Sequence, residues 1–282
     1  MPTFAKATAG QPRKRFAQHF LEGAWVNKLV AAVEATHDDA ILEIGPGRGA
    51  ITRPLAEQAG RLLAIEVDRD LAADLEAAAL PRVRVITSDV LQVDLEPIVA
   101  EWLEVPPGPA NQIRVVGNLP YNISSPILFM LLDFAARTGG VRDALLMLQK
   151  EVADRLVARV GTGEYGVLTV LTALNADVKR VLSLPPGAFR PQPKVHSAVV
   201  RLTFRPAAVD IPDQQLFVRM VRTMFTQRRK TLGNALKPFA VERGGDAAKA
   251  LADAGIDPQR RPETLQLAEM AALARTFSAP VS

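Results

Sequence analysis

The sequence predicts a mixed α/β fold that is followed by a small all-helical domain. Short apolar runs alternate with amphipathic stretches over the first two-thirds of the chain, a pattern typical of a parallel sheet with helices on both faces. A glycine-rich turn, Gly45-Pro46-Gly47-Arg48-Gly49, follows the first of these runs. Beyond about residue 208 every pattern is helical. We therefore expect a sheet domain over residues 1–207 and a helical domain over residues 208–282.

The expected elements follow from the apolar runs and from the residues that interrupt them. Gly60 and Pro81 end two helical stretches, because glycine weakens a helix and proline breaks it. The segments 185–187 and 191–193 are rich in proline and predict an ordered loop before the last strand. The expected strands are 40–44, 62–67, 83–87, 113–117, 144–148 and 195–204, and the expected helices between them are 51–58, 70–79, 125–136 and 151–160.

The composition excludes several kinds of protein. The 282 residues include no cysteine, which excludes disulfide frameworks and thiolate metal sites or nucleophiles. The three histidines lie far apart, so we expect no metal site. The longest apolar run, 127–132, is far shorter than the roughly 20 residues of a membrane span. We expect a soluble, cytoplasmic, monomeric protein, and its formal charge of +4 favours an anionic partner.

Acidic residues at the ends of successive strands predict a nucleoside cofactor beside the glycine-rich turn. Such a turn between a strand and a helix lets the backbone approach a ligand closely. Glu66 ends the second strand, where its carboxylate can accept hydrogen bonds from two ribose hydroxyls. Asp89 follows the third strand and is placed to accept from an adenine amine. The pattern Gly45-x-Gly47-x-x-Ala50 also fits a nicotinamide dinucleotide, so the cofactor stays open at this point.

The stretch Asn118-Leu119-Pro120-Tyr121 predicts methylation of an adenine amine. The nitrogen of that amine is a poor nucleophile because its lone pair is delocalised into the ring. Two acceptors on its N–H bonds, the Asn118 side-chain oxygen and the Leu119 carbonyl, would aim the lone pair at a methyl donor. Pro120 stiffens the turn, and Tyr121 offers a face on which the base can stack. S-adenosylmethionine is then the expected cofactor.

The chain also resembles a known family over nearly its whole length. The matching segments are RKRFAQHFL (13–21), EIGPGRG (43–49), EVDRD (66–70), GNLPYNIS (117–124), LQKEVA (148–153), FRPQPKVHSAVV (189–200) and FTQRRKTL (225–232). In this order they are similar to the bacterial ribosomal RNA adenine dimethyltransferases, which modify two adjacent adenosines near the 3′ end of small-subunit RNA. The resemblance implies a Rossmann-like class I S-adenosylmethionine-dependent methyltransferase sheet.

The resemblance further implies where the cofactor and the base lie. Phe189 would face Tyr121 across an adenine that has left its stack. Two residues of the N-terminal arm depart from the family pattern: His19 stands where asparagine is frequent, and Ala17 stands where glycine is usual. Gly161-Thr162-Gly163 departs from a turn in which proline is expected. The implied cofactor-binding residues are His19, Leu21, Gly45, Gly47, Glu66, Asp89, Val90 and Asn118.

Basic residues predict how the RNA is reached. An apolar stripe of helical spacing, which includes Phe217 and Val221, leaves basic side chains mainly on the other face. Such side chains can neutralise phosphates, while the folded ribosomal surface selects the target by shape rather than sequence. We therefore expect the partner to be small-subunit RNA within the 30S subunit or its precursor. The expected RNA-binding residues are Arg13, Lys14, Arg15, Lys194, Arg222, Arg228, Arg229 and Lys230.

Three alternatives stay open on the sequence alone. A nicotinamide-dependent oxidoreductase fits the glycine-rich turn but leaves the stretch 118–121 unexplained. A non-catalytic RNA-binding or ribosome-assembly protein is disfavoured by the intact Glu66, Asp89 and Asn118. A large-subunit ribosomal RNA adenine methyltransferase would keep the chemistry and change the RNA. The segment 189–200 and the long helical C-terminus favour the small subunit over that third alternative.

Overall fold

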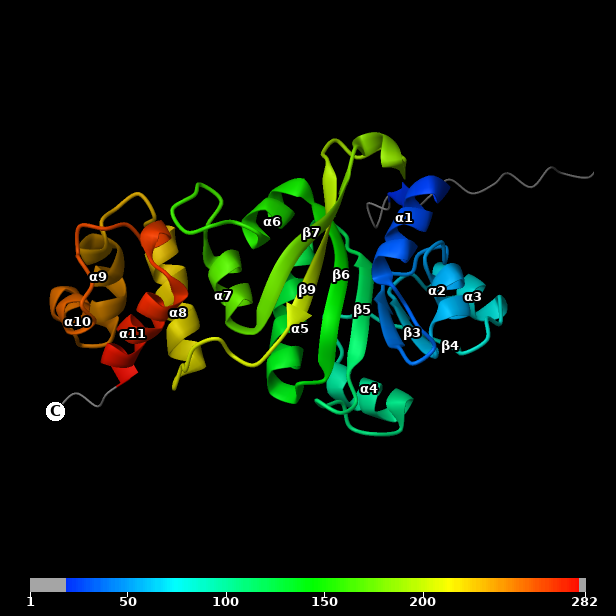
Figure 1. The fold of residues 1–282 in the computed structure, drawn as a ribbon, viewed down its shortest axis with the longest axis horizontal. Helices are drawn as coiled ribbons and strands as arrows, with labels where there is room; N and C mark the ends of the chain where they lie inside the picture. Colours follow the sequence, from blue (N-terminus) through cyan, green and yellow to red (C-terminus); the bar gives the residue numbers. More distant parts are fainter. Residues whose placement is uncertain (1–18, 279–282) are drawn as a thin grey trace, which may run out of the picture.

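The computed structural model describes residues 19–278. A sheet with flanking helices takes up the first two-thirds of these residues, and a cluster of helices follows at the C-terminal end (Figure 1). The expected RNA-binding residues Arg13, Lys14 and Arg15 lie outside the described residues, as does the departure at Ala17.

The strands form one main sheet and one small ribbon. Their bounds are β1 (Phe20–Leu21), β2 (Ala40–Ile44), β3 (Arg61–Glu66), β4 (Val83–Thr87), β5 (Ile113–Asn118), β6 (Val141–Gln149), β7 (Ala176–Leu184), β8 (Phe189–Arg190) and β9 (Ser197–Phe204). The main sheet has seven strands in the order β4-β3-β2-β5-β6-β9-β7. The strands from β4 to β6 are parallel, whereas β9 runs antiparallel to both β6 and β7. The ribbon consists of β1 paired antiparallel with β8.

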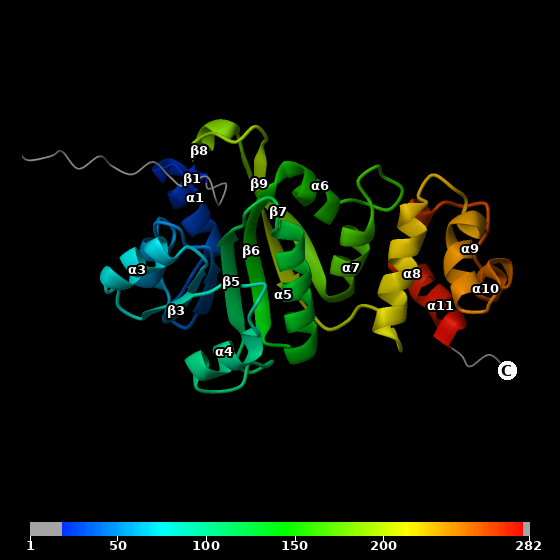
Figure 2. The same ribbon diagram turned by 180° about the vertical axis from the view of Figure 1, so that it is seen from behind.

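Helices cover both faces of this sheet (Figures 1 and 2). Their bounds are α1 (Gly23–Val33), α2 (Thr52–Gln58), α3 (Arg69–Ala77), α4 (Leu95–Leu103), α5 (Ser124–Thr138), α6 (Lys150–Leu156) and α7 (Val167–Asn175). Helices α1 to α3 share one apolar core with Ile41 of β2, whereas α4 to α6 share another core with Leu42. Adjacent residues of β2 fall into different cores because successive side chains of a strand point to opposite faces.

The C-terminal helices lie next to α7 of the sheet domain (Figure 2). The apolar core of these helices includes residues of the sheet domain. They are α8 (Gln214–Thr226), α9 (Leu232–Glu242), α10 (Ala247–Asp253), the short 3₁₀ helix η2 (Pro262–Thr264) and α11 (Leu267–Ser278). Phe217 and Leu236 are buried at the centre of this core, as the apolar stripe predicts. Tyr165, Leu171 and Leu174, on and just before α7, belong to the same core. Helix α7 therefore precedes the expected boundary at residue 208 and yet packs with the helices that follow it.

The apolar pattern predicted some of the observed strands and helices but not others. The strand expected at 40–44 is β2, whose continuous apolar run suits a strand buried on both faces. The strand expected at 83–87 is β4, an edge strand whose side chains are only partly buried or exposed. Strand β7 was not expected, since it lies at the edge of the sheet and its partly exposed residues include Asp177 and Lys179. Helices α1, α4 and α7 were not expected either. Strand β9 begins at Ser197 rather than at residue 195, and Val195 is exposed.

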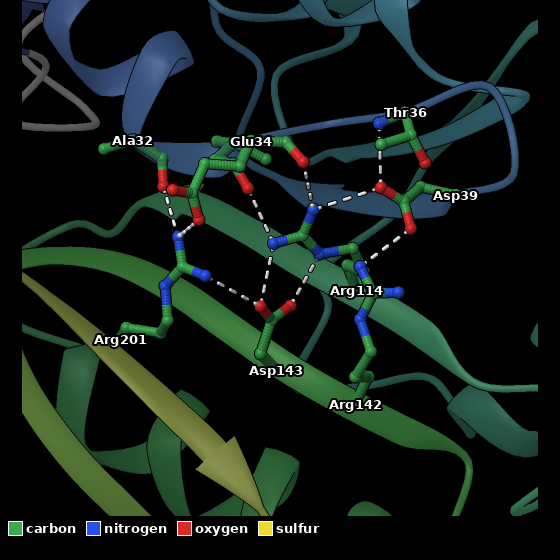
Figure 3. A network of polar contacts seen from close by, with 9 residues as sticks. Ala32, Glu34, Thr36, Asp39, Arg114, Arg142, Asp143 and Arg201 are labelled. Carbon is green, nitrogen blue, oxygen red and sulfur yellow. Dashed lines mark hydrogen bonds and ion pairs between the residues drawn. The ribbon is translucent and has the colours of Figure 1, made fainter.

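A buried ion-pair network joins α1 to the amino ends of β2, β5 and β6 (Figure 3). The Arg114 side chain is 4% exposed and donates two hydrogen bonds of 2.8 Å to Asp143 and one of 3.1 Å to Asp39. It also donates to the main-chain carbonyl oxygens of Val33 and Glu34, at the C-terminal end of α1. A buried charge is tolerated only when partners such as these replace the water that it has lost.

Asp39 is held by more than Arg114. Arg142 donates to Asp39 Oδ1 at 2.7 Å, and the Thr36 N–H donates to Oδ2 at 2.9 Å. Burial would raise the pKa of the Asp39 carboxyl, but the Thr36 hydrogen bond and the charges of Arg114 and Arg142 outweigh burial and hold this pKa below its ordinary value. Arg201 of β9 also joins the network (Figure 3). The amino edge of the sheet is thus closed by charges that compensate one another.

Candidate active site at the carboxyl edge of the sheet

Four parallel strands end side by side at the opposite edge of the sheet. Strand β2 lies between β3 and β5, and β4 lies beyond β3. The glycine-rich turn (45–49) follows β2, Glu66 ends β3, Asp89 follows β4, and Asn118 ends β5. In an open parallel sheet, ligands bind at this carboxyl edge. The structure therefore brings the expected cofactor residues and the expected catalytic loop to one edge.

The glycine-rich turn depends on backbone conformations that favour glycine. Gly45, Gly47 and Gly49 have φ values of 70°, 58° and 77°, which would strain any residue with a side chain. The Glu66 carboxylate holds this turn from β3, because Oε2 accepts the Gly47 N–H at 2.9 Å and Oε1 accepts the Asp68 N–H at 2.9 Å. Each carboxylate oxygen can accept a further hydrogen bond, so Glu66 can fix the turn and still bind a ligand hydroxyl.

Glu43 has a buried carboxyl group and lies in β2, two residues before the turn. The sequence alone did not indicate that this carboxyl group is buried or protonated. Its side chain is 1% exposed, and Oε2 has no hydrogen-bond partner among the residues that the structure describes. Burial, to which the nearby charge of Glu66 adds, raises the pKa of Glu43 to about 7. A large fraction of Glu43 is therefore protonated at neutral pH.

The expected catalytic loop is held in place by main-chain hydrogen bonds. The Leu119 N–H donates to the Met147 carbonyl of β6 at 3.2 Å, and the Leu119 side chain is buried. The Pro120 carbonyl accepts the Ile123 N–H at 3.1 Å, which closes a turn at the start of α5. Pro120 itself is exposed. The loop that leaves β5 is thus fixed at both ends, as a site that positions a reacting amine requires.

Tyr121 is anchored from the strand on the far side of β6. Its hydroxyl lies 2.7 Å from Oγ of Ser197, the first residue of β9. The ring is half-buried, and burial raises the pKa of its hydroxyl. Tyr121 therefore stays neutral at physiological pH and presents a ring of fixed orientation.

His19, the first of the described residues, lies against this loop. His19 Nδ1 is 2.7 Å from the Pro191 carbonyl oxygen, and the main-chain carbonyl of His19 accepts a hydrogen bond of 3.3 Å from Asn118 Nδ2. The imidazole ring of His19 stacks on Tyr121, with ring centroids 5.8 Å apart and planes inclined by 24°. The next residues of the arm form β1, in which Leu21 pairs with β8. The structure thus places His19 beside the catalytic loop, whereas Leu21 pairs with Phe189 in the ribbon.

Phe189 is buried in this structure, whereas the resemblance implies that its ring lies against a base opposite Tyr121. Its ring is 0% exposed and belongs to the core that also contains residues of α1. In the ribbon, Phe189 pairs with Leu21 of β1. The ring therefore has no free face for a base, and the aromatic ring that stacks on Tyr121 is that of His19. Sequence position alone could not reveal that the Phe189 side chain points into the core.

The remaining expected cofactor residues lie in the loop after β4. Asp89 is half-buried, and its Oδ1 accepts the Leu91 N–H at 3.0 Å. Val90 is buried against the core on the α4 side of the sheet. The Asp89 carboxylate is therefore oriented by its own loop, and its second oxygen has no hydrogen bond to another described residue.

The expected RNA-binding residues differ in what they contact. Arg228 donates to the main-chain carbonyl oxygens of Thr162, at 2.9 Å, and Gly163, so its guanidinium holds the loop between α6 and α7. This contact assigns Arg228 a structural role that the sequence did not indicate. The exposed members of the group are Lys194, Arg222, Arg229 and Lys230.

Residues 19–278 contain neither a metal-binding cluster nor a membrane-spanning helix. No cluster of three or more histidine, aspartate or glutamate side chains in this range could hold a metal ion. None of the helices in the same range has the length and apolar character needed to cross a membrane.

Related sequences match almost the whole chain. The family described as ribosomal RNA adenine dimethylase matches residues 9–278. The ribosomal RNA small subunit methyltransferase A of Xanthomonas axonopodis pv. citri (strain 306) is 46% identical over 266 residues, which cover 93% of this chain and 95% of the relative. The protein of the same name from Moorella thermoacetica is 43% identical over 270 residues, which cover 94% of this chain and 92% of the relative.

Solved structures match both the sheet and the C-terminal helices. A dimethyladenosine transferase from Plasmodium falciparum has a TM-score of 0.74 at 22% identity, and the match covers 92% of this chain and 98% of that one. The 23S rRNA methyltransferase ErmE has a TM-score of 0.62 at 25% identity, with 92% and 100% covered. The expected fold class, a Rossmann-like class I methyltransferase sheet with C-terminal helices, is confirmed.

Proposed function

Because the chain belongs to the ribosomal RNA adenine dimethylase family, we propose that it dimethylates two adjacent adenosines in small-subunit ribosomal RNA. The methyl groups come from S-adenosylmethionine and go to the exocyclic amines of adenosines in the 3′-terminal hairpin, during ribosome biogenesis. The observation that carries the proposal is the position of Asn118 and Tyr121 at the same sheet edge as the glycine-rich turn (45–49). Methyl transfer requires donor and amine to be held together, and this edge brings together the residues proposed to hold each of them.

The residues around the turn fit S-adenosylmethionine. A Cβ at Gly45 would meet no atom within 4 Å, so the turn leaves open space in front of β2. The free lone pairs of Glu66 can accept from the ribose hydroxyls, and Asp89 can accept from the adenine amine of the cofactor. When bound, the cofactor supplies an electrophilic methyl group on a sulfonium. The residues proposed to hold it are His19, Leu21, Gly45, Gly47, Glu66, Asp89, Val90 and Asn118.

Asn118 and the Leu119 carbonyl orient the amine in this proposal. Asn118 Nδ2 already donates to the arm at His19, so Oδ1 is the amide atom left to accept from a substrate amine. The hydrogen bond from the Leu119 N–H to Met147 fixes the peptide that precedes the second acceptor. Acceptors on both N–H bonds aim the lone pair and stabilise the positive charge that develops on nitrogen. No strong base is needed, because the methylated amine cation loses a proton readily.

The target base stacks on Tyr121 in this proposal. Its entry requires the His19 ring to leave the Tyr121 face that it covers. We keep Phe189 as the second face of the clamp, a role that requires its ring to turn out of the core when RNA binds. Stacking on aromatic side chains contributes about 1–3 kcal/mol per base, which offsets part of the cost of removing the base from its own stack.

We further propose that the RNA is bound as part of the 30S subunit or its precursor, by a monomeric protein in the cytoplasm. The exposed side chains of Arg222 and Arg229 lie on and just after α8 and can reach phosphates without breaking an ion pair within the described residues. Changing both to glutamate should weaken methylation of small subunits, and more so at low salt. The residues proposed for phosphate contacts are Arg13, Lys14, Arg15, Lys194, Arg222, Arg229 and Lys230.

A large-subunit target is the alternative that a specific observation favours, namely the likeness to ErmE. That likeness is at 25% identity, however, whereas the small-subunit relatives reach 43% and 46%. An oxidoreductase is disfavoured by family membership. Calorimetry with S-adenosylmethionine and with NAD separates these chemistries directly, since the proposal requires binding of the first.

A direct test uses purified ribosomal subunits that lack the modification. Small and large subunits are incubated separately with the protein and labelled S-adenosylmethionine, and both RNAs are then analysed by mass spectrometry. Dimethyladenosine is expected at two adjacent positions of the small-subunit RNA and nowhere in the large-subunit RNA. Product in the large-subunit RNA would support the alternative, and absence of product in both would contradict the proposed function.

A further inference from the structure

A pocket of about 560 Å³ lies beside the catalytic loop, on the side away from the glycine-rich turn. Its walls are the first turn of α6, the loop between α6 and α7, and the segment just before β9, which all lie at the same end of the sheet (Figure 1). His196 lines the pocket and precedes Ser197, whose Oγ is 2.7 Å from the Tyr121 hydroxyl. The His196 carbonyl accepts the Lys150 N–H at 2.9 Å, which ties two of the walls together. The pocket therefore begins one residue from the anchor of Tyr121.

The third wall of the pocket is held by the C-terminal helices. Arg228 donates to the carbonyl oxygens of Thr162 and Gly163, and the Gly161 N–H donates to the Glu263 carbonyl at 2.8 Å. The loop between α6 and α7 thus depends on residues after α8 for its position. The helices proposed to dock on the ribosome also shape the pocket next to the catalytic loop.

The charges of the pocket are compensated unequally. Lys150 Nζ is 2.7 Å from Asp154, which also accepts from Arg180. Partial burial would raise the pKa of Asp154, but its hydrogen bonds from Lys150 and Arg180 outweigh burial and hold that pKa below its ordinary value. Two cations, of which only Lys150 lines the pocket, therefore share one carboxylate. Lys194 and Glu164 line the pocket as well, and neither forms an ion pair with another described residue.

The remaining charged pair of the lining neutralises itself, because Arg155 Nη2 is 2.5 Å from Glu151. The charged side chains of the lining balance one another, and those without an ion pair to another described residue are the ammonium of Lys194 and the carboxylate of Glu164, while Lys150 shares Asp154 with Arg180. Its volume lies within the range of about 300–1,000 Å³ that is usual for small organic ligands. A single nucleotide has this size and this combination of an anionic phosphate with a base that carries hydrogen-bond donors.

We propose that this pocket binds the nucleotide adjoining the target adenosine, with its phosphate near Lys150 and Lys194 and its base amine on Glu164. The inference rests on the proposed function, under which the two modified adenosines are adjacent. Ammonium groups neutralise RNA phosphates, and a carboxylate accepts from an exocyclic amine. Because an RNA strand has a direction, this arrangement holds for one of the two adenosines: while the one whose partner lies on the pocket side is methylated on the loop 118–121, that partner occupies the pocket. Arg228 acts as a positioning residue that keeps the pocket wall in place.

This arrangement makes the two dimethylations unequal. An unmodified adenosine in the pocket has N–H bonds that Glu164 can accept, whereas a dimethylated amine has none. Glu164 therefore assists the first dimethylation, when the neighbour is unmodified, and gives no hydrogen bond during the second. A merely structural role for Glu164 would affect both steps alike.

The test compares the rates of the two steps in the full-length protein. Unmethylated small subunits are reacted with the wild-type protein, with the Glu164→Ala variant and with the Glu76→Ala variant. The last is the control, because Glu76 is an exposed residue of α3, far from the pocket. Mass spectrometry of the RNA fragment that holds both adenosines gives the amounts with none, one or two of them dimethylated over time. Glu164→Ala should slow the first dimethylation about tenfold, the effect of losing one hydrogen bond to a charged group, and leave the second unchanged.

The possible outcomes separate the inference from the function on which it rests. Equal slowing of both steps by Glu164→Ala, or no slowing of either, would overturn the pocket assignment. Absence of dimethyladenosine with the wild-type protein would instead contradict the proposed function. Because Glu164 is exposed, its replacement should leave thermal unfolding unchanged, and Glu76→Ala should match the wild type in both steps.

Discussion

The two edges of the main sheet differ in whether their buried ionisable side chains have hydrogen-bond and ion-pair partners. At the amino edge, Arg114 is buried together with Asp39 and Asp143, and each charge has partners from the chain (Figure 3). At the carboxyl edge, Glu43 is buried as deeply, yet one of its oxygens has no partner among the described residues. The turn beside it adopts left-handed backbone conformations at Gly45 and its neighbours. One edge is completed by the chain itself, and the other keeps unsatisfied groups where we propose that ligands bind.

This difference separates residues that hold the fold from residues that serve the reaction. Replacing a residue of the amino edge should change the free energy of unfolding, because its partners are left buried without compensation. Replacing a residue of the carboxyl edge should change activity more than stability. In some cases such a replacement should even stabilise the protein, because strained or unsatisfied groups at functional sites cost stability.

The largest loss of stability is expected for Arg114→Ala. The substitution leaves Asp39 and Asp143 buried without their cation, which should lower the free energy of unfolding by about 3–5 kcal/mol. Denaturant titration measures this loss. The matched control is Arg84→Ala, because the Arg84–Glu101 pair has side chains that are 44% and 70% exposed and should contribute at most about 1 kcal/mol. Equal losses in the two variants would show that the buried network does not stabilise the fold.

The largest loss of activity is expected for Asn118→Ala. Removing one of two acceptors that orient the amine should lower kcat by roughly 10²–10³-fold. Turnover is measured on unmethylated small subunits at saturating S-adenosylmethionine, and thermal unfolding is measured in parallel. Asn234→Ala, at an exposed position of α9, serves as the control. A variant that keeps near wild-type kcat would remove Asn118 from the proposed mechanism.

A smaller and pH-dependent gain in stability is expected for Glu43→Gln. The folded protein holds this proton up to a pKa of about 7, whereas the ordinary value is 4.5. Between these pH values the folded state binds more protons than the unfolded state, so wild-type stability falls as pH rises and levels off above pH 7. Glutamine does not titrate, and its advantage should grow over the same window to on the order of 3 kcal/mol.

Urea titrations of the Glu43→Gln variant and the wild type at pH 5 and pH 8 measure this difference. The variant should be more stable by at most about 1 kcal/mol at pH 5 and by on the order of 3 kcal/mol at pH 8. A constant difference across this range would mean that Glu43 does not titrate as its burial indicates.

The smallest effect is expected for His19→Asn. The substitution removes the ring that covers Tyr121, while the main-chain carbonyl that accepts from Asn118 remains. An aromatic pair contributes about 0.5–1.5 kcal/mol, so a base that no longer displaces this ring should bind more readily. The KM for small subunits is expected to fall about threefold with little change in kcat. A rise in KM would indicate that the imidazole helps to bind the RNA instead of covering the site.

Local sequence patterns were sufficient for the elements that position the site. A buried apolar run located β2, and the β-branched residues of segment 83–87 located β4. The rule that parallel strands place their carboxyl ends together located Glu66 and Asn118 correctly relative to the glycine-rich turn. These predictions depend on short stretches of chain and on the handedness of strand–helix–strand units. They require no knowledge of contacts between distant side chains.

Contacts between distant segments were beyond such patterns. Arg114 and Asp39 are separated by 75 residues, and Arg228 bonds a carbonyl 66 residues away, so no local pattern links them. The Phe189 ring lies in the core because β8 pairs with β1, and that pairing joins segments from the two ends of the sheet domain. The edge strand β7 was not predicted, because many of its side chains are polar and partly exposed and its sequence therefore lacks an apolar run.

The shared core of α7 and the C-terminal helices sets where hybrid proteins can be joined. Tyr165 donates to the Leu265 carbonyl at 3.0 Å, and Leu171 and Leu174 pack among side chains of α8 to α11. A chimaera joined at residue 208 would pair these side chains with foreign helices and leave mismatched surfaces at the junction. A graft that carries α7 and the preceding loop with the helices would keep the shared core intact. The transferable unit of this protein therefore begins before Tyr165, well upstream of residue 208.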